Sequence, residues 1–170
     1  MANNIEFDTE DKLKYTFYPV TNGVVNFRVR ASNDAHLALT SGPVESNPML
    51  EVFIGGWKNT KSVIRKNRAK PDVSEAYIPG ILSVGEYRGF WIKWNDDVIT
   101  VGMEGASAAF LSYKNPEPFP INFVGVCTSY GSSGSWIIQQ NEPAPSASIA
   151  QVSDAVACFL PTAGEGREGF

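Results

Sequence analysis

Two stretches decide the fold of this chain, Met49-Leu-Glu-Val-Phe-Ile-Gly-Gly-Trp57 and Tyr87-Arg-Gly-Phe-Trp-Ile-Lys-Trp94. Aromatic and β-branched residues dominate both stretches, so each predicts a β-strand. Side chains of a strand alternate between its two faces, and the second stretch therefore has one core face and one face that we expect to be exposed for recognition. The core face carries Phe90, Ile92 and Trp94, and the recognition face carries Tyr87, Trp91 and Lys93.

The rest of the chain repeats this strand pattern at short intervals. No segment has a helical period of useful length, and Gly, Pro, Asn and Asp separate the apolar runs. The sequence thus predicts an all-β fold, an antiparallel two-sheet β-sandwich or jelly roll of about ten strands. Besides residues 49–54 and 87–94, the expected strands are 13–18, 24–30, 35–40, 60–66, 98–102, 108–113, 122–128 and 135–139.

The connections are predicted from their turn residues. Residues 21–23 and 95–97 have the length and composition of hairpin turns. Residues 70–85 contain two prolines and predict a long loop with a short strand at 76–82. After position 140 the chain becomes rich in Ser, Pro, Ala and Gly, so we expect a domain over 1–140 and a linker with a loosely ordered tail over 141–170.

Length, charge and the lack of long apolar runs limit the classes of function that the chain can have. A chain of 170 residues is expected to make one domain. Its net charge of -4 and isoelectric point near 5.0 argue against nucleic-acid binding. No apolar run approaches the roughly 20 residues of a membrane span, and the first residues lack a signal-peptide pattern, so we expect a soluble, cytoplasmic protein. One basic strip, residues 58–70, contains six cations and no acid, which indicates an anionic ligand or a solvated hairpin.

Candidate catalytic and metal groups are few. His36 is the single histidine, and Asp34 precedes it by two residues on the predicted strand. A catalytic dyad would also need a nucleophile such as Cys127, and an exposed strand histidine beside a turn aspartate is the simpler interpretation. Cys127 and Cys158 lack metal or redox spacing and are expected to be free thiols. We predict no catalytic set and no metal site.

Five segments occur in an order that resembles a known family. They are residues 27–42, 54–65, 86–91, 116–120 and 125–128, which include Ile54-Gly-Gly-Trp-Lys-Asn-Thr-Lys-Ser-Val-Ile-Arg65 and Pro116-Glu-Pro-Phe-Pro120. From about Lys12 to about Ile138 the chain closely resembles the farnesoic acid O-methyltransferase domain family of arthropods. Several separate motifs in one order are far more specific than a single short pattern.

The resemblance implies methyl transfer from S-adenosylmethionine to farnesoic acid in juvenile hormone synthesis, with the substrate carboxylate near Arg65 or Arg88. A usual cofactor site of that kind needs a strand, a Gly-rich turn and a helix in a doubly wound fold. Gly55 and Gly56 follow a strand, but the next residues have β character. Tyr130 stands where similar sequences often carry Trp.

The sequence therefore leads to a binding module as the main hypothesis, with a glycan or another small amphipathic ligand, no cofactor and possible self-association. The alternative is an S-adenosylmethionine-dependent O-methyltransferase, and a third possibility is an oligomerisation domain. Trp94 and Trp136 are expected in the core. The predicted ligand-binding residues are His36, Trp57, Lys58, Lys61, Arg65, Tyr87, Arg88 and Trp91.

Overall fold

Apolar residues alternate with polar ones along several strands and define the face that packs into the core. The computed structural model describes residues 3–140. In β3 (Val24–Ala31), Val25, Phe27 and Val29 are buried, whereas the arginines between and after them are exposed. This two-residue period requires a second apolar layer opposite the strand, and a second sheet provides it.

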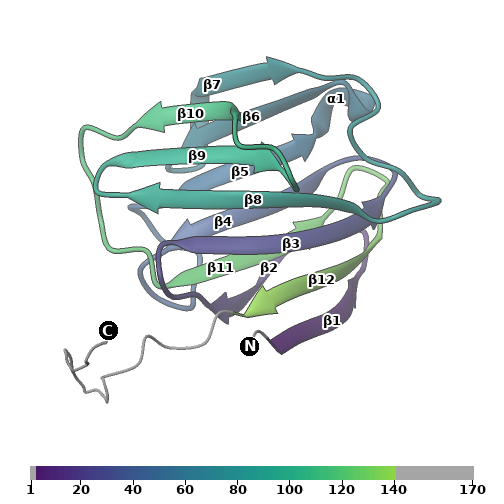
Figure 1. Cartoon of the computed structure of the whole chain (residues 1–170), viewed down its shortest axis with the longest axis horizontal. Coiled ribbons are helices and arrows are strands. Elements are labelled where there is room, and N and C mark those ends of the chain that lie inside the picture. Colours follow the sequence, from purple (N-terminus) through teal and green to yellow (C-terminus); the bar gives the residue numbers. More distant parts are fainter. Residues whose placement is uncertain (1–2, 141–170) are drawn as a thin grey trace. The chain divides into compact units, whose positions relative to one another are not determined.

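The strands form two antiparallel sheets (Figure 1). The six-stranded sheet has the spatial order β1 (Asn3–Thr9), β12 (Gly134–Gln140), β3, β8 (Arg88–Asn95), β9 (Val98–Met103) and β10 (Ala109–Lys114). The five-stranded sheet has the order β11 (Phe123–Thr128), β4 (Ala35–Thr40), β5 (Leu50–Gly55), β6 (Lys61–Lys66) and β7 (Ala69–Tyr77). A further strand, β2 (Lys12–Pro19), lies beside β11 (Figure 1).

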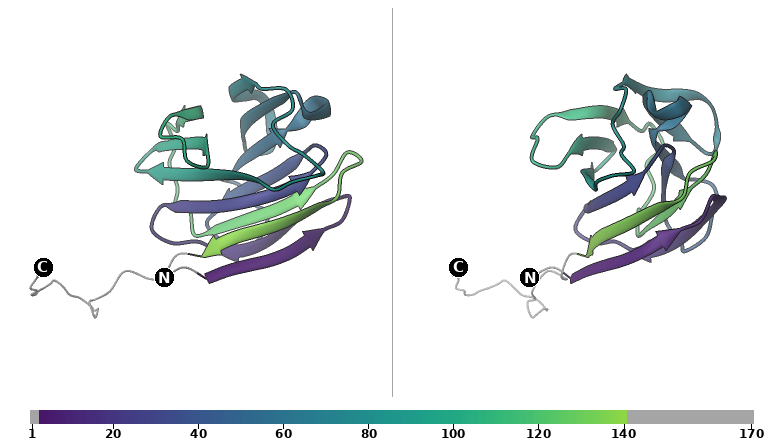
Figure 2. Two further views of the ribbon diagram at one scale, coloured as in Figure 1. Left: turned by 45° about the vertical axis from the view of Figure 1, so that its right-hand side comes forward. Right: turned by 90° about the vertical axis from the view of Figure 1, so that its right-hand side faces the viewer.

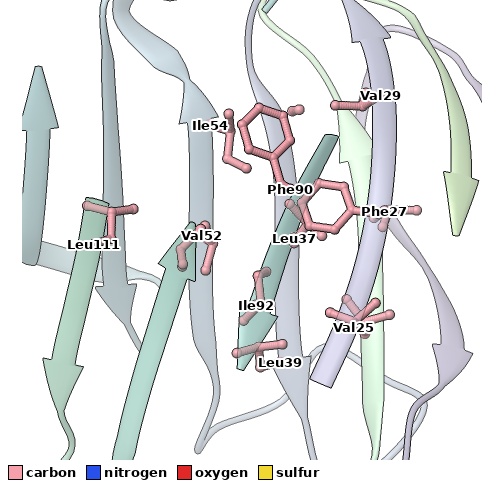
Figure 3. Close-up of a cluster of buried hydrophobic side chains, with 14 of the residues drawn as sticks. Val25, Phe27, Val29, Leu37, Leu39, Val52, Ile54, Phe90, Ile92 and Leu111 are labelled. Carbon is pink, nitrogen blue, oxygen red and sulfur yellow. The ribbon is translucent and has the colours of Figure 1, made fainter. Parts of the chain in front are cut away.

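The hydrophobic core lies between the two sheets, which Figure 2 shows as separate layers. Leu37, Leu39 and Val52 from the five-stranded sheet meet Phe27 and Phe90 from the six-stranded sheet (Figure 3). At one edge the layers are joined by β7 and β10, where the Ser112 backbone N–H donates to Ser74 Oγ at 3.3 Å. Burial of both inner faces sets the register of every strand, because a slip of one residue would turn apolar side chains outward.

The predicted fold class is confirmed, with twelve strands within residues 3–140 where about ten were expected. The two strands that the sequence did not predict are both at sheet edges. β1 is largely polar, and β7 was predicted as part of a long loop because it contains Pro71. An edge strand tolerates proline because its outward N–H needs no partner in the ladder. The short strand predicted at 76–82 is wrong, since β7 ends at Tyr77.

One predicted hairpin is confirmed and the other is wrong. Residues 95–97 join the paired strands β8 and β9, with Asp96 in the left-handed region at φ 56°. Residues 21–23 instead carry the chain from β2 to β3 in the other sheet. Gly23 accounts for this crossing, because its carbonyl accepts a hydrogen bond from the Trp94 N–H at 2.9 Å and a Cβ there would lie 2.8 Å from the Trp94 carbonyl oxygen.

The tryptophans divide between the core and the sheet surfaces. Trp136 is fully buried, as predicted, and Trp94 packs partly buried against the core. The predicted exposure of Trp91 is wrong, since only 7% of it is accessible. Its indole lies over Gly102 of the neighbouring strand, donates from Nε1 to the Ala106 carbonyl at 3.0 Å and is covered by the Lys93 ammonium, 4.6 Å from the ring centroid.

The helical content is small. The one helix among residues 3–140 is α1 (Gly56–Asn59), and no helix in this part of the chain is long and apolar enough to cross a membrane. The predicted tail, residues 141–170, and Cys158 lie outside the described residues.

The close packing of Trp91 on Gly102 predicts a specific stability defect. A Cβ at position 102 would lie 2.0 Å from Trp91 Cζ2, so Gly102→Ala must displace a rigid ring. We expect a loss of about 1–3 kcal/mol in the free energy of unfolding, measured by urea titration. Gly42→Ala is the matched control, because no atom lies within 4 Å of its added methyl group. Equal midpoints for the two variants would contradict this packing.

Candidate functional site

A cleft of about 460 Å³ opens on the outer face of the five-stranded sheet. Its floor comes from residues that alternate along β4, β5 and β6 with the core residues Leu37, Val52 and Ile64. Its walls come from the turns before β4, after β5 and after β11, and from the start of β7. The lining residues are Asn33, Asp34, His36, Phe53, Trp57, Lys58, Arg65, Lys70 and Tyr130.

Two stacked rings form the centre of the floor. His36 of β4 and Phe53 of β5 face each other in register, with ring centroids 4.0 Å apart and an interplanar angle of 25°. Tyr130 approaches His36 from the turn after β11, with centroids 6.0 Å apart, and is itself 69% exposed. The expectation of an exposed His36 is therefore wrong. The imidazole points away from the inter-sheet core, but neighbouring side chains leave only 2% of the residue accessible.

The turn before β4 holds Asp34 against the histidine. Asp34 adopts φ 50°, and its Oδ1 lies 3.0 Å from His36 Nε2. Its Oδ2 accepts a hydrogen bond from Asn33 Nδ2 at 2.7 Å, so both carboxylate oxygens have partners within the protein. His36 Nδ1 is buried without a partner among the described residues. The predicted Asp34–His36 proximity is thus confirmed as a hydrogen-bonding contact.

A left-handed turn presents the tryptophan at one end of the cleft. Trp57, Lys58 and Asn59 have φ values of 50°, 60° and 61°. Such backbone costs roughly 1–2 kcal/mol per non-glycine residue, so it needs support from its surroundings. Asn59 provides it, because Nδ2 donates to the Leu82 carbonyl at 2.9 Å and Oδ1 accepts from the Leu82 N–H at 3.0 Å.

The turn leaves the Trp57 indole 44% exposed. The Lys61 ammonium lies 4.2 Å from the ring centroid, and this cation–π contact fixes one face of the ring. The cleft therefore offers two accessible aromatic side chains, Trp57 and Tyr130, from turns far apart in the sequence.

Arg65 lies on the floor near the other end. Its guanidinium is 4.9 Å from the Phe53 ring centroid, and Nε donates to Asp72 Oδ1 at 2.8 Å. Contact with a ring and a carboxylate holds a planar, permanently charged group in one orientation. Arg65 can therefore present its remaining N–H donors to a ligand without a large loss of side-chain entropy.

The structure divides the predicted site residues between two sheets. His36, Trp57, Lys58 and Arg65 line the cleft, and Lys61 lies under Trp57. Tyr87, Arg88 and Trp91 belong to the other sheet or the segment leading into it, so they do not join this site. Arg30 lies over the Tyr87 ring at 5.0 Å, while Arg88 bonds Glu86 and the Gly80 carbonyl.

Several lining residues were not in the predicted set. Phe53 could have been placed by strand alternation, since Val52 and Ile54 on either side are core residues. Asn33, Lys70 and Tyr130 have no local signal of this kind, because loops from separate parts of the chain bring them together.

The site residues match neither a metal centre nor a nucleoside cofactor site. Among residues 3–140, no three His, Cys, Asp or Glu side chains converge as a metal site. The described chain also has no strand, Gly-rich turn and helix of the kind that cradles a nucleoside cofactor. Gly55 and Gly56 lead into the left-handed turn of α1, which has only four residues and does not supply a helix N-terminus for a phosphate. The residues present do not fit a usual S-adenosylmethionine site.

Comparison with solved structures defines the class of fold. A Bacillus subtilis protein of unknown function with a galectin-like fold aligns with a TM-score of 0.52 and 8% identity, over 73% of each chain. A prokaryotic β-1,3-1,4-glucanase derived from a mouse hindgut metagenome aligns with a TM-score of 0.51 and 16% identity, over 81% of this chain and 78% of its own. The Crh5 transglycosylase in complex with NAG aligns with a TM-score of 0.51 and 14% identity, over 82% and 74%.

These likenesses show a galectin-like and glucanase-like β-sandwich fold. The sequence itself matches the family model described as farnesoic acid O-methyltransferase over residues 11–142. The chain belongs to this family, and the predicted resemblance is confirmed. No match is found among curated proteins.

Beside the cleft, a buried polar cluster occupies the same outer face. Gly125 and Ala38 are small residues in register, and the Tyr15 side chain packs over them to donate its hydroxyl to Glu51 Oε2. Burial raises the pKa of the Cys127 thiol to about 12, and the nearby Glu51 carboxylate adds to the shift. Burial also raises the pKa of Tyr15 well above its usual range, and the negative charge of Glu51 is the second cause. The Cys127 thiol is therefore not a thiolate nucleophile at neutral pH.

The raised pKa values of Cys127 and Tyr15 predict that the folded protein loses stability at alkaline pH. An unfolded thiol ionises from about pH 9, whereas folded Cys127 stays protonated to about pH 12. The stability that comes from keeping this buried thiol protonated is fully present below about pH 9 and is lost as the pH rises from about 9 to about 12. We expect the free energy of unfolding to fall by about 1.4 kcal/mol per pH unit for each such proton. Cys127→Ala should remove the thiol part of the slope in urea titrations between about pH 9 and 10. An unchanged slope would contradict the burial.

Proposed function

We propose that this protein is a glycan-binding module whose ligand occupies the cleft. The observation that carries the proposal is the combination of exposed rings with fixed polar groups in one concave site. Trp57 and Tyr130 offer apolar surfaces, Arg65 offers an oriented guanidinium, and Lys58 and Lys70 offer ammonium donors. A sugar presents C–H faces edged by hydroxyl groups, and this combination of surfaces suits it.

The structural neighbours add support. Two of them are carbohydrate-related by name, the β-1,3-1,4-glucanase and the transglycosylase in complex with NAG. Their low identity transfers the fold and no residue role. The shared fold makes a carbohydrate the first class of ligand to test.

The cleft favours binding over glycan hydrolysis. Glycoside hydrolases generally use two carboxyl groups that face each other across the scissile bond. Among the described lining residues, Asp34 is the only carboxylate, and both of its oxygens are engaged by Asn33 and His36. The arrangement can recognise a sugar but lacks this acid and base pair.

Substitution of the exposed rings tests the proposal. A panel of defined oligosaccharides is first screened on a glycan array, and the best binder is then titrated by calorimetry. Trp57→Ala and Tyr130→Ala should each weaken binding by about tenfold, since an aromatic contact contributes about 1 kcal/mol or more. Tyr77→Ala is the matched control, because this exposed tyrosine lies outside the cleft. Absence of binding across the panel, or equal losses in all three variants, would overturn the proposal.

Methyl transfer is the second candidate, and membership of the farnesoic acid O-methyltransferase family favours it. Arg65 beside the Phe53 ring offers a cation and an apolar surface, which would suit the carboxylate and chain of farnesoic acid. Arg88, the other residue considered for the carboxylate, is already bonded to Glu86 and to backbone carbonyls.

Calorimetry with S-adenosylmethionine separates the two functions. Because the described residues do not form a usual nucleoside cradle, we expect no saturable heat at cofactor concentrations up to the millimolar range. Saturable binding, followed by methyl ester formation from farnesoic acid, would instead establish the enzyme.

A further inference from the structure

The basic strip of the sequence separates into two groups in the folded protein. Four of its six cations have a carboxylate partner from another part of the structure. These pairs are Lys61 with Glu75 at 3.2 Å, Arg65 with Asp72 at 2.8 Å, Lys66 with Glu117 at 2.6 Å and Arg68 with Glu45 at 3.5 Å. The middle of the strip is therefore largely neutralised by the protein itself.

The two ends of the strip behave differently. Lys58 and Lys70 are exposed, both line the cleft, and neither has an ion pair with any residue of the described chain. The folded protein thus retains unpaired ammonium groups at the site that we propose for the ligand. Two uncompensated lysines in one concave site attract anions, and the cleft walls reduce solvent screening.

Asp34, the one carboxylate among the described lining residues, offsets only one of the three positive charges of Lys58, Arg65 and Lys70. Asp34 is turned toward the protein, where His36 and Asn33 engage its two oxygens. Arg65 adds a third cation at the floor, although Asp72 partly neutralises it. The cleft is therefore cationic in a chain whose overall charge is -4.

The positions of the two lysines favour an extended ligand. Lys58 lies in α1, just before β6, and Lys70 is the second residue of β7, beside the end of β6, so the two lysines lie near opposite ends of this strand. At about 3.3 Å per residue, the ends of β6 are roughly 17 Å apart. An extended ligand with repeated anionic groups can contact each lysine at its own end of the strand, whereas a single small anion would require both side chains to fold toward the middle of the cleft.

We propose that the cleft selects acidic oligosaccharides, which carry carboxylate or sulfate groups on more than one sugar. This inference rests on the proposed glycan-binding function and specifies its ligand class. Lys58 and Lys70 contact anionic groups near the two ends of the ligand, Arg65 contacts its centre, and Trp57 and Tyr130 pack against the sugar rings. The lysines determine selectivity, and the rings supply contact area common to many sugars.

The test compares ligands of equal length and different charge. Galacturonate oligomers, sulfated oligosaccharides and neutral β-glucan oligomers are titrated by calorimetry, together with monomeric galacturonate and inorganic polyphosphate. We expect both acidic oligomers to bind more tightly than the neutral oligomer, with affinity that decreases as salt is raised. Lys58→Gln/Lys70→Gln should weaken acidic binding by about 3- to 30-fold and leave neutral binding unchanged.

Lys12→Gln/Lys114→Gln is the matched control, since it removes two exposed charges outside the cleft. If this control weakens acidic binding equally, net charge rather than the cleft is responsible, and the inference fails. It also fails if the neutral oligomer binds as tightly as the acidic ones, although the glycan-binding function then stands. Monomeric galacturonate or polyphosphate binding as tightly as the acidic oligomers would likewise overturn it. If no oligosaccharide binds, the glycan-binding function fails as well.

Discussion

Burial of the two inner sheet faces is the constraint on which the rest of the structure depends. Because side chains alternate along each strand, the burial of Leu37 and Val52 forces His36 and Phe53 onto the opposite face of the same sheet. The stacked rings of the cleft are therefore a consequence of core register. A change of strand register that disturbed the core would therefore also separate the stacked rings of His36 and Phe53.

On this rigid face, the connections between strands supply the variable part of the site. The left-handed turn at residues 57–59 is unfavourable backbone for three non-glycine residues, and the two hydrogen bonds between Asn59 and Leu82 oppose the strain. The same turn exposes Trp57. A fold with a rigid sheet and strained connections can hold recognition groups in fixed positions, which reduces the entropy lost on binding.

The cations of the basic strip divide into paired and unpaired groups. Most cations of the basic strip pair with carboxylates that lie outside the strip, such as Asp72 with Arg65 and Glu117 with Lys66. The exposed pairs, such as Lys66 with Glu117, contribute little to stability, and all four pairs offset positive charge around the cleft. Lys58 and Lys70 are then the two cations of the basic strip without a carboxylate partner among the described residues.

The sequence by itself determined the strands with a clear two-residue period, their antiparallel sandwich arrangement and the family, because these depend on local alternation and motif order. It did not determine the edge strands β1 and β7, where polar residues and Pro71 obscure the pattern. Only the tertiary structure decided which side chains are covered, as for Trp91 and His36, and which cations lack partners. Coverage and pairing depend on residues from distant segments, such as Ala106 and Tyr130, whose approach is set by the packing of whole sheets.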